Sequence, residues 1–368
     1  MRILLTADTV GGVWTYALEL AGALREHGVE IALATMGEPL SAWQREEVQE
    51  HPNIELFESR FRLEWMQDPW DDVRRAGDWL LELEQRVRPA VVHLNGYAHA
   101  ALPWKAPVLV VGHSCVLSWW AAVKRERAPA TWDRYREAVA RGLFAADLVL
   151  APSTAMLRAL EEHYGPLPRA GVVYNGRDPD RFRPGAKEPF ILTAGRVWDE
   201  GKNIGALAEI APSLDWPIFV AGEGKHPDRG AVAHDGLHQL GRLPGRELAA
   251  WLGRASIFAL PARYEPFGFT PLEAALAGCA LVLGDIPSLR EVWGDAAVFV
   301  PPDDSEALRS ALQRLIADDA ALEALADRAR LHALRFTPQR MAAGYLAAYR
   351  SLLADRSRPA RGTLACAS

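Results

Sequence analysis

The stretch RILLTADTVGGVWTYALELAGALREHGVEIALATM, residues 2–36, decides the fold of this chain. Residues 2–7 are a short apolar run typical of a buried parallel strand, and residues 13–27 repeat apolar side chains at helical spacing before Gly28. Residues 30–36 form a second apolar run, so the stretch predicts a strand–helix–strand unit. Such units build parallel sheets covered by helices on both faces, which indicates a doubly wound α/β domain.

The same alternation continues through the first half of the chain. Later strands are expected at 91–94, 108–112, 148–151 and 171–174, with the main helices at 71–87, 132–145 and 153–163. We therefore expect residues 1–180 to form an N-terminal Rossmann-like domain.

A polar, proline-rich segment at 177–189 then interrupts the pattern. A new series of strands and helices starts at residue 190, which predicts a second Rossmann-like domain over 185–335. A helix at about 338–353 is expected to pack back on the first domain. Residues 356–368 lack periodicity and are expected to form a disordered tail.

The composition excludes several classes of protein. The net charge of −6 argues against a nucleic-acid binder, because such proteins carry a basic face. Three scattered cysteines support neither a zinc site nor a disulfide framework. The first apolar run is too short for a signal peptide, and no stretch has the length of a membrane span. We expect a cytoplasmic protein, and peripheral membrane contact is not favoured.

The segment Glu265-Pro-Phe-Gly-Phe-Thr-Pro-Leu-Glu273 follows a predicted strand at 256–260. Backbone N–H groups around Gly268 can face a phosphate, with the dipole of the next helix behind them. Thr270 to Glu273 matches a capping box with proline at the first helical position, so Glu273 has a structural explanation. Glu265 has no such local role and is well placed to accept hydrogen bonds from sugar hydroxyls.

Two cations, Arg196 and Lys202, lie between a predicted strand and a predicted helix. At the carboxyl edge of a parallel sheet they can converge on one anion, and two cations suit a diphosphate leaving group. The alternative is a solvated loop with ordinary surface charges.

Polar and glycine residues also end strands of the first domain. Gly11 and Gly12 would let the backbone approach a ligand at a helix N-terminus, although a tight turn is the alternative. His113 and Asn175 follow two other strands, which suggests a ligand cleft between the domains. Trp119 and Trp120 are candidates for lining an acceptor pocket, although most tryptophans fill cores.

These segments, in this order, resemble the retaining glycosyltransferases of family 4, and the resemblance covers nearly the whole chain up to about Leu353. Glu265 and Glu273 match the paired-glutamate motif of that family, and Arg196 and Lys202 match its basic pair. The Asp-Glu-Gly-Lys order before Asn203 departs from the commoner Lys-Gly order. The resemblance implies the GT-B fold, in which two Rossmann-like domains face each other across a cleft.

The resemblance also implies roles for individual residues. Arg196 and Lys202 would hold the diphosphate, Glu273 the ribose, and Glu265 the donor sugar. The remaining contacts would come from Gly11 and Gly12 at the phosphates, His113 at the transferred sugar, the segment Phe267, Gly268 and Phe269 beside Glu265, and Arg242 with Leu243 near the base.

The implied reaction is transfer of a hexose from a nucleotide-diphosphate sugar to a hydroxyl, with retention of configuration by front-face substitution. No divalent metal or other cofactor is expected, because the cations and helix N-termini take its place. UDP-glucose is the expected donor. A small hydrophilic acceptor is preferred, since acidic residues dilute the modestly basic stretch at 124–141.

Two alternatives stay open from the sequence. A nucleotide-sugar epimerase of the same architecture would rearrange the donor without an acceptor. A non-catalytic nucleotide-sugar-binding module would bind the donor without turnover. An NAD-dependent oxidoreductase is disfavoured by the glycine spacing.

Overall fold

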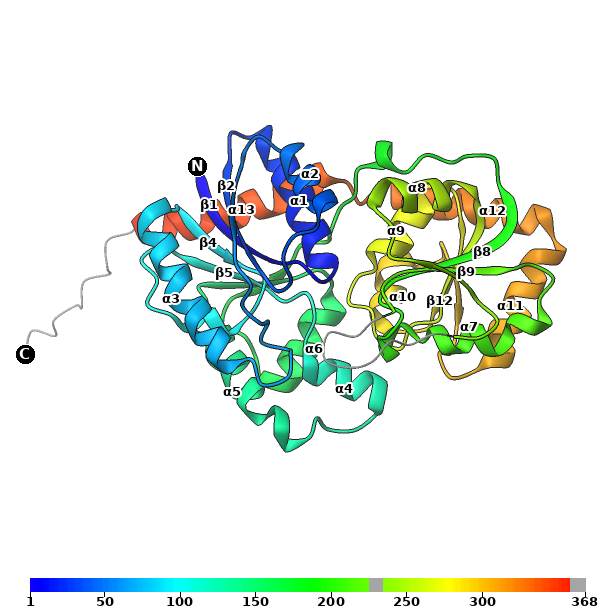
Figure 1. Ribbon diagram of the computed structural model, residues 1–368, viewed down its shortest axis with the longest axis horizontal. Coiled ribbons are helices and arrows are strands. Elements are labelled where there is room, and N and C mark those ends of the chain that lie inside the picture. Colours follow the sequence, from blue (N-terminus) through cyan, green and yellow to red (C-terminus); the bar gives the residue numbers. More distant parts are fainter. Residues whose placement is uncertain (225–233, 358–368) are drawn as a thin grey trace, which may run out of the picture.

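The computed structural model describes residues 1–224 and 234–357, which form two α/β domains joined at a hinge (Figure 1). The sheet of the first domain is parallel throughout and has the order β3-β2-β1-β4-β5-β6-β7. Its strands are β1 (Arg2–Asp8), β2 (Glu30–Met36), β3 (Ile54–Glu58), β4 (Val91–Leu94), β5 (Val108–Val111), β6 (Leu148–Ala151) and β7 (Ala170–Val172).

Helices cover both faces of this sheet because its strands are apolar on both sides. Along β1, Ile3 and Leu5 pack into the core on the α1 face, whereas Leu4 packs into the core on the other face. This alternation is the expected behaviour of a parallel strand buried between two helical layers. The helices are α1 (Gly12–Arg25), α2 (Ala42–Gln49), α3 (Trp70–Val87), α4 (Val116–Lys124), α5 (Asp133–Ala145) and α6 (Thr154–Tyr164).

The second domain repeats the design with a parallel sheet of order β10-β9-β8-β11-β12-β13. Its strands are β8 (Glu188–Ala194), β9 (Ile218–Ala221), β10 (His238–Gly241), β11 (Ala255–Leu260), β12 (Ala280–Gly284) and β13 (Val298–Val300). Its helices are α7 (Ile204–Ile210), α8 (Gly245–Arg254), α9 (Phe269–Leu276), α10 (Pro287–Trp293), α11 (Ser305–Ala317) and α12 (Asp319–Ala333).

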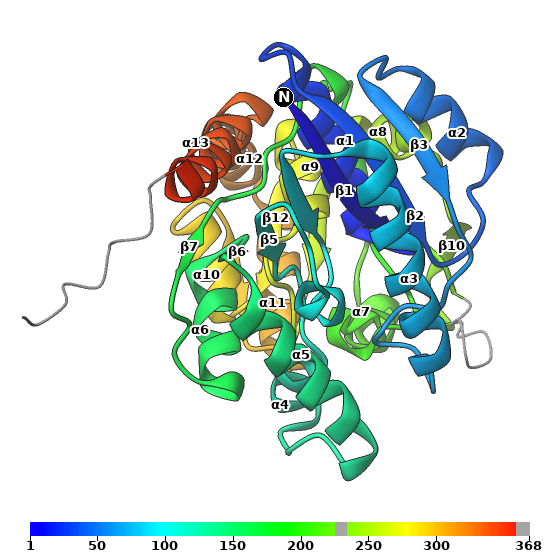
Figure 2. The ribbon, with the colours of Figure 1, turned by 90° about the vertical axis from the view of Figure 1, so that its left-hand side faces the viewer.

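The last helix, α13 (Pro338–Ser357), leaves the second domain and packs against α1 of the first (Figures 1 and 2). Its residues Tyr345 and Tyr349 are fully buried in the core beneath α1. The helix includes Arg356 and Ser357, where the sequence predicted the start of the tail. The rest of that predicted tail, 358–368, lies outside the described residues. No helix in the described part of the chain is both long and apolar enough to cross a membrane.

The chain crosses between the domains at two points, which touch each other. The backbone N–H of Arg177, on the first crossing, donates to the carbonyl oxygen of Phe336 on the second, at 2.9 Å. A Cβ atom on the neighbouring Gly176 would lie 2.2 Å from the carbonyl oxygen of Thr337. Glycine at 176 is therefore what allows the two crossings to pack together.

Gly176→Ala is expected to lower the free energy of unfolding by about 3 kcal/mol or more, because backbone atoms of both crossings must move apart. Urea denaturation of the variant and the wild type measures the difference. Gly205→Ala is the matched control, since it lies in α7 and its added Cβ would meet nothing nearer than 3.6 Å. An unchanged midpoint for Gly176→Ala would contradict the close packing described here.

Both sheets have a topological switch point, which lies between two neighbouring strands whose following connections run toward opposite edges of the sheet. In the first sheet it lies between β1 and β4, and in the second between β8 and β11. Ligands of doubly wound proteins bind outside the carboxyl ends of the strands at such points. The loops after β1 and β4 and after β8 and β11, together with the loop after the neighbouring β5, therefore form the candidate site.

Candidate active site

The loop after β8 carries the two predicted cations, and each has a carboxylate partner. The Lys202 ammonium pairs with Glu265 in the loop after β11, and both side chains are nearly buried. The Arg196 guanidinium pairs with Asp199 at 2.8 Å. The structure thus brings Arg196, Lys202 and Glu265 together at the switch point of the second sheet.

Asp199 is a residue that the sequence reasoning did not assign to the site. Its Oδ1 atom accepts hydrogen bonds from the Gly201 backbone N–H and the Trp119 indole N–H, both at 2.9 Å. Burial raises the pKa of Asp199, but Arg196 and Lys202 outweigh burial and hold that pKa below its usual value. The ionised carboxylate therefore fixes Arg196 and attaches Trp119, from the first domain, to this loop.

The glycine loop of the first domain lies opposite these cations. A Cβ atom on Gly11 would lie 3.7 Å from Nη1 of Arg196, and one on Gly12 would lie 3.7 Å from the Phe269 ring. The loop is shaped by Asp8, whose Oδ1 accepts the Gly11 N–H at 3.0 Å. Helix α1 begins at Gly12, so its N-terminal end faces the same region as Arg196.

His113, after β5, is held neutral in a defined tautomer. Its Nε2 lies 2.8 Å from Oδ1 of Asn95, and the Asn95 amide donates to the Thr6 carbonyl at 2.6 Å. That bond orients the amide, so the histidine must carry its proton on Nε2 and leave Nδ1 as an acceptor. Burial, including edge contact with the Tyr16 ring at 4.4 Å, lowers the pKa of His113 to about 3.

The His113 environment makes stability depend on pH. The pKa is about 3 in the folded state and 6.5 ordinarily, so below pH 6.5 the unfolded chain binds the extra proton. The contribution of neutral His113 to the free energy of unfolding is fully present above pH 6.5. As the pH falls from 6.5 toward 3, this contribution is lost at about 1.4 kcal/mol per pH unit. Urea denaturation at pH 7, 5 and 4 measures this dependence. Between pH 6.5 and 4, the free energy of unfolding of His113→Gln should fall less steeply than that of the wild type, by about 1.4 kcal/mol per pH unit. His27→Gln, at an exposed position, is the control and should keep the wild-type slope. An identical slope in His113→Gln and the wild type would contradict a neutral His113 in the folded protein.

The capping box predicted at Thr270 to Glu273 is wrong. Gly268 adopts a left-handed conformation with φ +95° and starts α9 at Phe269, two residues before the predicted start. Thr270 therefore lies inside the helix and its hydroxyl donates to the Ala194 carbonyl at 3.3 Å. Glu273 is buried and its Oε1 instead accepts from Nε of Arg177 at 2.7 Å. A positive-φ glycine and a distant arginine override the local capping pattern.

Some of the aromatic residues and of the residues predicted near the nucleotide base lie in the core, and others lie at the surface. Phe267 is buried against Phe269 and Phe336, so only its backbone can face a ligand. Trp120 packs against the core of the first domain and Leu243 against that of the second. The exposed Arg242 guanidinium lies over the Trp43 ring at 5.1 Å, across the gap between the domains.

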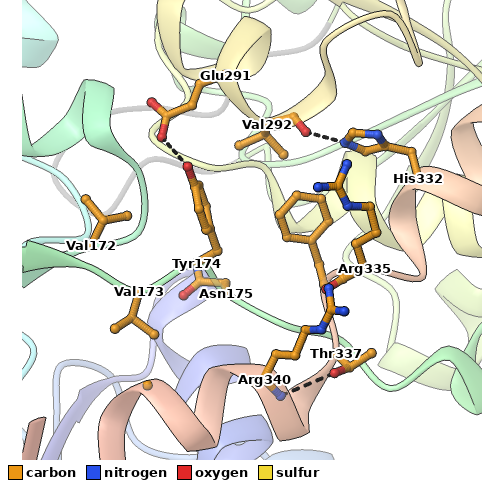
Figure 3. Close-up of a pocket in the computed structure, with 12 residues that line it drawn as sticks. Val172, Val173, Tyr174, Asn175, Glu291, Val292, His332, Arg335, Thr337 and Arg340 are labelled. Atoms are coloured by element: carbon orange, nitrogen blue, oxygen red, sulfur yellow. Dashed lines mark hydrogen bonds between the residues drawn. The ribbon is translucent and has the colours of Figure 1, made fainter. Parts of the chain in front are cut away.

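The structure places Asn175 in a pocket of about 370 Å³ at the hinge, whose lining includes no other predicted site residue (Figure 3). Tyr174, Arg335 and Arg340 line it with Asn175. Asn175 is buried, and its Oδ1 has no hydrogen-bond partner among the described residues. The position of a polar residue at a strand end does not by itself distinguish the hinge from the cleft.

Contacts that the sequence did not reveal hold the domains together beside the site. The Tyr264 hydroxyl accepts the Cys115 backbone N–H at 3.0 Å, at the start of α4. Ser153 donates to the Pro266 carbonyl at 2.7 Å, so both residues flanking Glu265 are fixed by the first domain. Burial raises the pKa of Tyr264 to about 12, so this residue stays a neutral hydroxyl.

Comparisons with known proteins agree with this geometry. The family model of Glycosyltransferase Family 4 matches residues 10–181, and that of Glycosyl transferases group 1 matches residues 188–318. A glycogen synthase of Mycobacterium tuberculosis is 31% identical over 288 residues, which cover 70% of this chain and 67% of the relative. A D-inositol 3-phosphate glycosyltransferase of Xylanimonas cellulosilytica is 27% identical over 404 residues, with 95% and 94% covered.

A solved structure shows the same architecture. The Anabaena protein HepE, in complex with UDP-glucose, matches with a TM-score of 0.75 and 16% identity over 95% of this chain and 100% of its own. The predicted arrangement of two doubly wound domains is therefore confirmed as the GT-B fold. The chain belongs to glycosyltransferase family 4, and it is a transferase enzyme.

Proposed function

We propose that this enzyme moves a hexose from a nucleoside diphosphate sugar to a hydroxyl acceptor, with retention of configuration and without a divalent metal. The observation that carries the proposal is the meeting of Arg196, Lys202 and Glu265 opposite the Gly11–Gly12 start of α1. Two cations and a helix N-terminus supply the positive charge that the diphosphate needs.

The donor diphosphate would bind the two cations beside their present carboxylate partners, Asp199 and Glu265. Arg196 is about one-third exposed at the cleft, whereas Asp199 beneath it is buried. The guanidinium can therefore keep its bond to Asp199 and still present N–H groups to a phosphate. Lys202 would share its ammonium protons between Glu265 and the leaving phosphate oxygen, where charge grows as the bond breaks.

The transferred sugar would lie between Glu265 and His113. The Glu265 carboxylate accepts hydrogen bonds from sugar hydroxyls. Its negative charge stabilises the positive charge that develops at the anomeric carbon. The unprotonated Nδ1 of His113 accepts one further hydroxyl. Both groups orient the sugar, and neither is required to form a covalent bond.

In the proposed step, the acceptor oxygen attacks the anomeric carbon on the face that the diphosphate leaves. The bond between the anomeric carbon and the phosphate oxygen breaks, and its electron pair goes to that oxygen. The acceptor proton passes to the same departing oxygen, and a new glycosidic bond forms. This exchange balances without a protein nucleophile.

The donor and acceptor are proposed from the relatives and from the surface. UDP-glucose is the proposed donor, since HepE is described in complex with it. The ribose would lie at Glu273 and the base near Arg242 and Leu243. A small hydrophilic acceptor fits the relationship to a D-inositol 3-phosphate glycosyltransferase.

A donor panel tests the proposal. UDP-, GDP- and ADP-sugars are incubated in EDTA with and without a panel of polyol and sugar acceptors, and NMR follows the anomeric signals. Transfer with the donor's configuration is expected. Rearrangement of the donor without an acceptor would instead indicate an epimerase, and binding without turnover would indicate a binding module.

A further inference from the structure

Arg177 lies where the two domains, both hinge crossings and the proposed ribose position meet. Its guanidinium pairs with Glu19 of α1 in the first domain and with Glu273 of α9 in the second. Its backbone N–H donates to Phe336 on the second crossing, and its guanidinium stacks over the Phe182 ring at 4.9 Å. Every part of this residue is therefore fixed by a different element.

The three charged side chains are almost removed from water, with 11% of Arg177, 8% of Glu19 and 5% of Glu273 exposed. A buried carboxylate is strongly disfavoured unless a cation compensates its charge. Burial raises the pKa of Glu273, and the Arg177 charge acts in the opposite direction. The guanidinium itself stays protonated, because the two carboxylates outweigh its burial and raise its pKa.

The geometry leaves one oxygen of Glu273 free. Arg177 binds Oε1 through Nε at 2.7 Å, and no residue that the structure describes hydrogen-bonds Oε2. A carboxylate held at one oxygen has a fixed direction for the other. The second oxygen can then accept hydrogen bonds from a ligand without the cost of ordering the side chain.

We propose that Arg177 is a positioning residue, which holds Glu273 in the orientation that accepts the ribose hydroxyls of the nucleotide. This inference rests on the proposed function, and it adds that the ribose contact depends on the hinge. Because Glu19 and Phe336 fix Arg177, the arrangement of α1 and of the second crossing sets the direction of the Glu273 carboxylate.

The test measures discrimination of ribose rather than activity. Dissociation constants for UDP and 2′,3′-dideoxy-UDP are compared in each variant by titration calorimetry. The wild type is expected to bind UDP about 10-fold to 100-fold more tightly, as for hydrogen bonds to a charged group. Arg177→Met should bring that ratio close to one, while affinity for inorganic diphosphate stays within about threefold.

Two further variants separate positioning from general stability. Arg177→Lys keeps the charge and supports folding, but its single ammonium cannot reproduce the guanidinium fork, so a clearly reduced ratio is expected. Arg183→Met is the matched control, because this arginine lies on the same crossing and its side chain forms an exposed ion pair with Asp180. It should keep the wild-type ratio.

The possible results test the role of Arg177 and the proposed function separately. A wild type that prefers UDP, together with a folded Arg177→Met or Arg177→Lys that keeps the full preference, would overturn the role of Arg177 alone. A wild type without preference would overturn the ribose contact itself. If the wild type binds no UDP, GDP or ADP, the proposed function fails and this inference fails with it.

Discussion

Replacing Lys202 by methionine is expected to lower kcat/KM for sugar transfer by about 100-fold to 1,000-fold. The ammonium lies in a nearly buried position beside Glu265, where water screens its charge weakly. In the proposed step its interaction with the leaving phosphate grows as the bond between sugar and phosphate breaks, so its loss should lower kcat as well as donor affinity. Initial rates at varied donor concentration, with circular dichroism as a check of folding, measure the effect.

Lys124→Met is the control for this substitution. Lys124 makes a partly exposed pair with Glu200 at 2.5 Å, and such pairs contribute roughly 1 kcal/mol or less. Its kcat/KM should stay within about fivefold of the wild type. A folded Lys202→Met that retains more than about a tenth of the activity would contradict the diphosphate role of Lys202.

Glu265→Gln is expected to lower kcat by about 100-fold, with a smaller change in the affinity for the donor. Glutamine keeps the size of the side chain and can still bond a hydroxyl. It lacks the negative charge that pairs with Lys202. In the proposed step that charge also stabilises the positive charge developing at the anomeric carbon. Separate determination of kcat and of the donor dissociation constant distinguishes these two effects.

The more exposed Glu200, two residues before Lys202 in sequence, supplies the control. Glu200→Gln should leave kcat nearly unchanged. A second experiment adds azide to Glu265→Ala, because azide can enter the space of a missing nucleophilic carboxylate and displace the diphosphate from the sugar with inversion. Formation of a glycosyl azide of inverted configuration would contradict the front-face step proposed here.

The sequence predicted the buried strands well, because both faces of these strands are apolar. The residue bounds predicted for β2, β4 and β6 agree with the structure. The edge strands β3 and β10 were missed, since their side chains are largely half-buried or exposed and carry no continuous apolar run. Local patterns reveal burial, and strands at the edge of a sheet have little of it.

Glu273 shows where local reasoning fails. Thr270 to Glu273 has the spacing of a capping box, but the helix starts earlier and Glu273 turns to Arg177, which is distant in sequence. Asp199, Asn95 and Tyr264 also act through residues far away along the chain. No periodicity or motif predicts such pairings, because tertiary packing creates them.

The central claim is that the cleft formed by Arg196, Lys202 and the Gly11–Gly12 loop binds the diphosphate of a nucleotide sugar. Thermal unfolding in EDTA tests this claim most directly. UDP, GDP, ADP and their sugars are each added at about 0.1 mM, which is about 100 times a dissociation constant of 1 μM. The account predicts a rise in melting temperature with at least one nucleotide series in the wild type, and no rise in the folded Arg196→Met/Lys202→Met double variant. An unchanged wild-type melting temperature with every ligand, or an equal rise in the double variant, would contradict the claim.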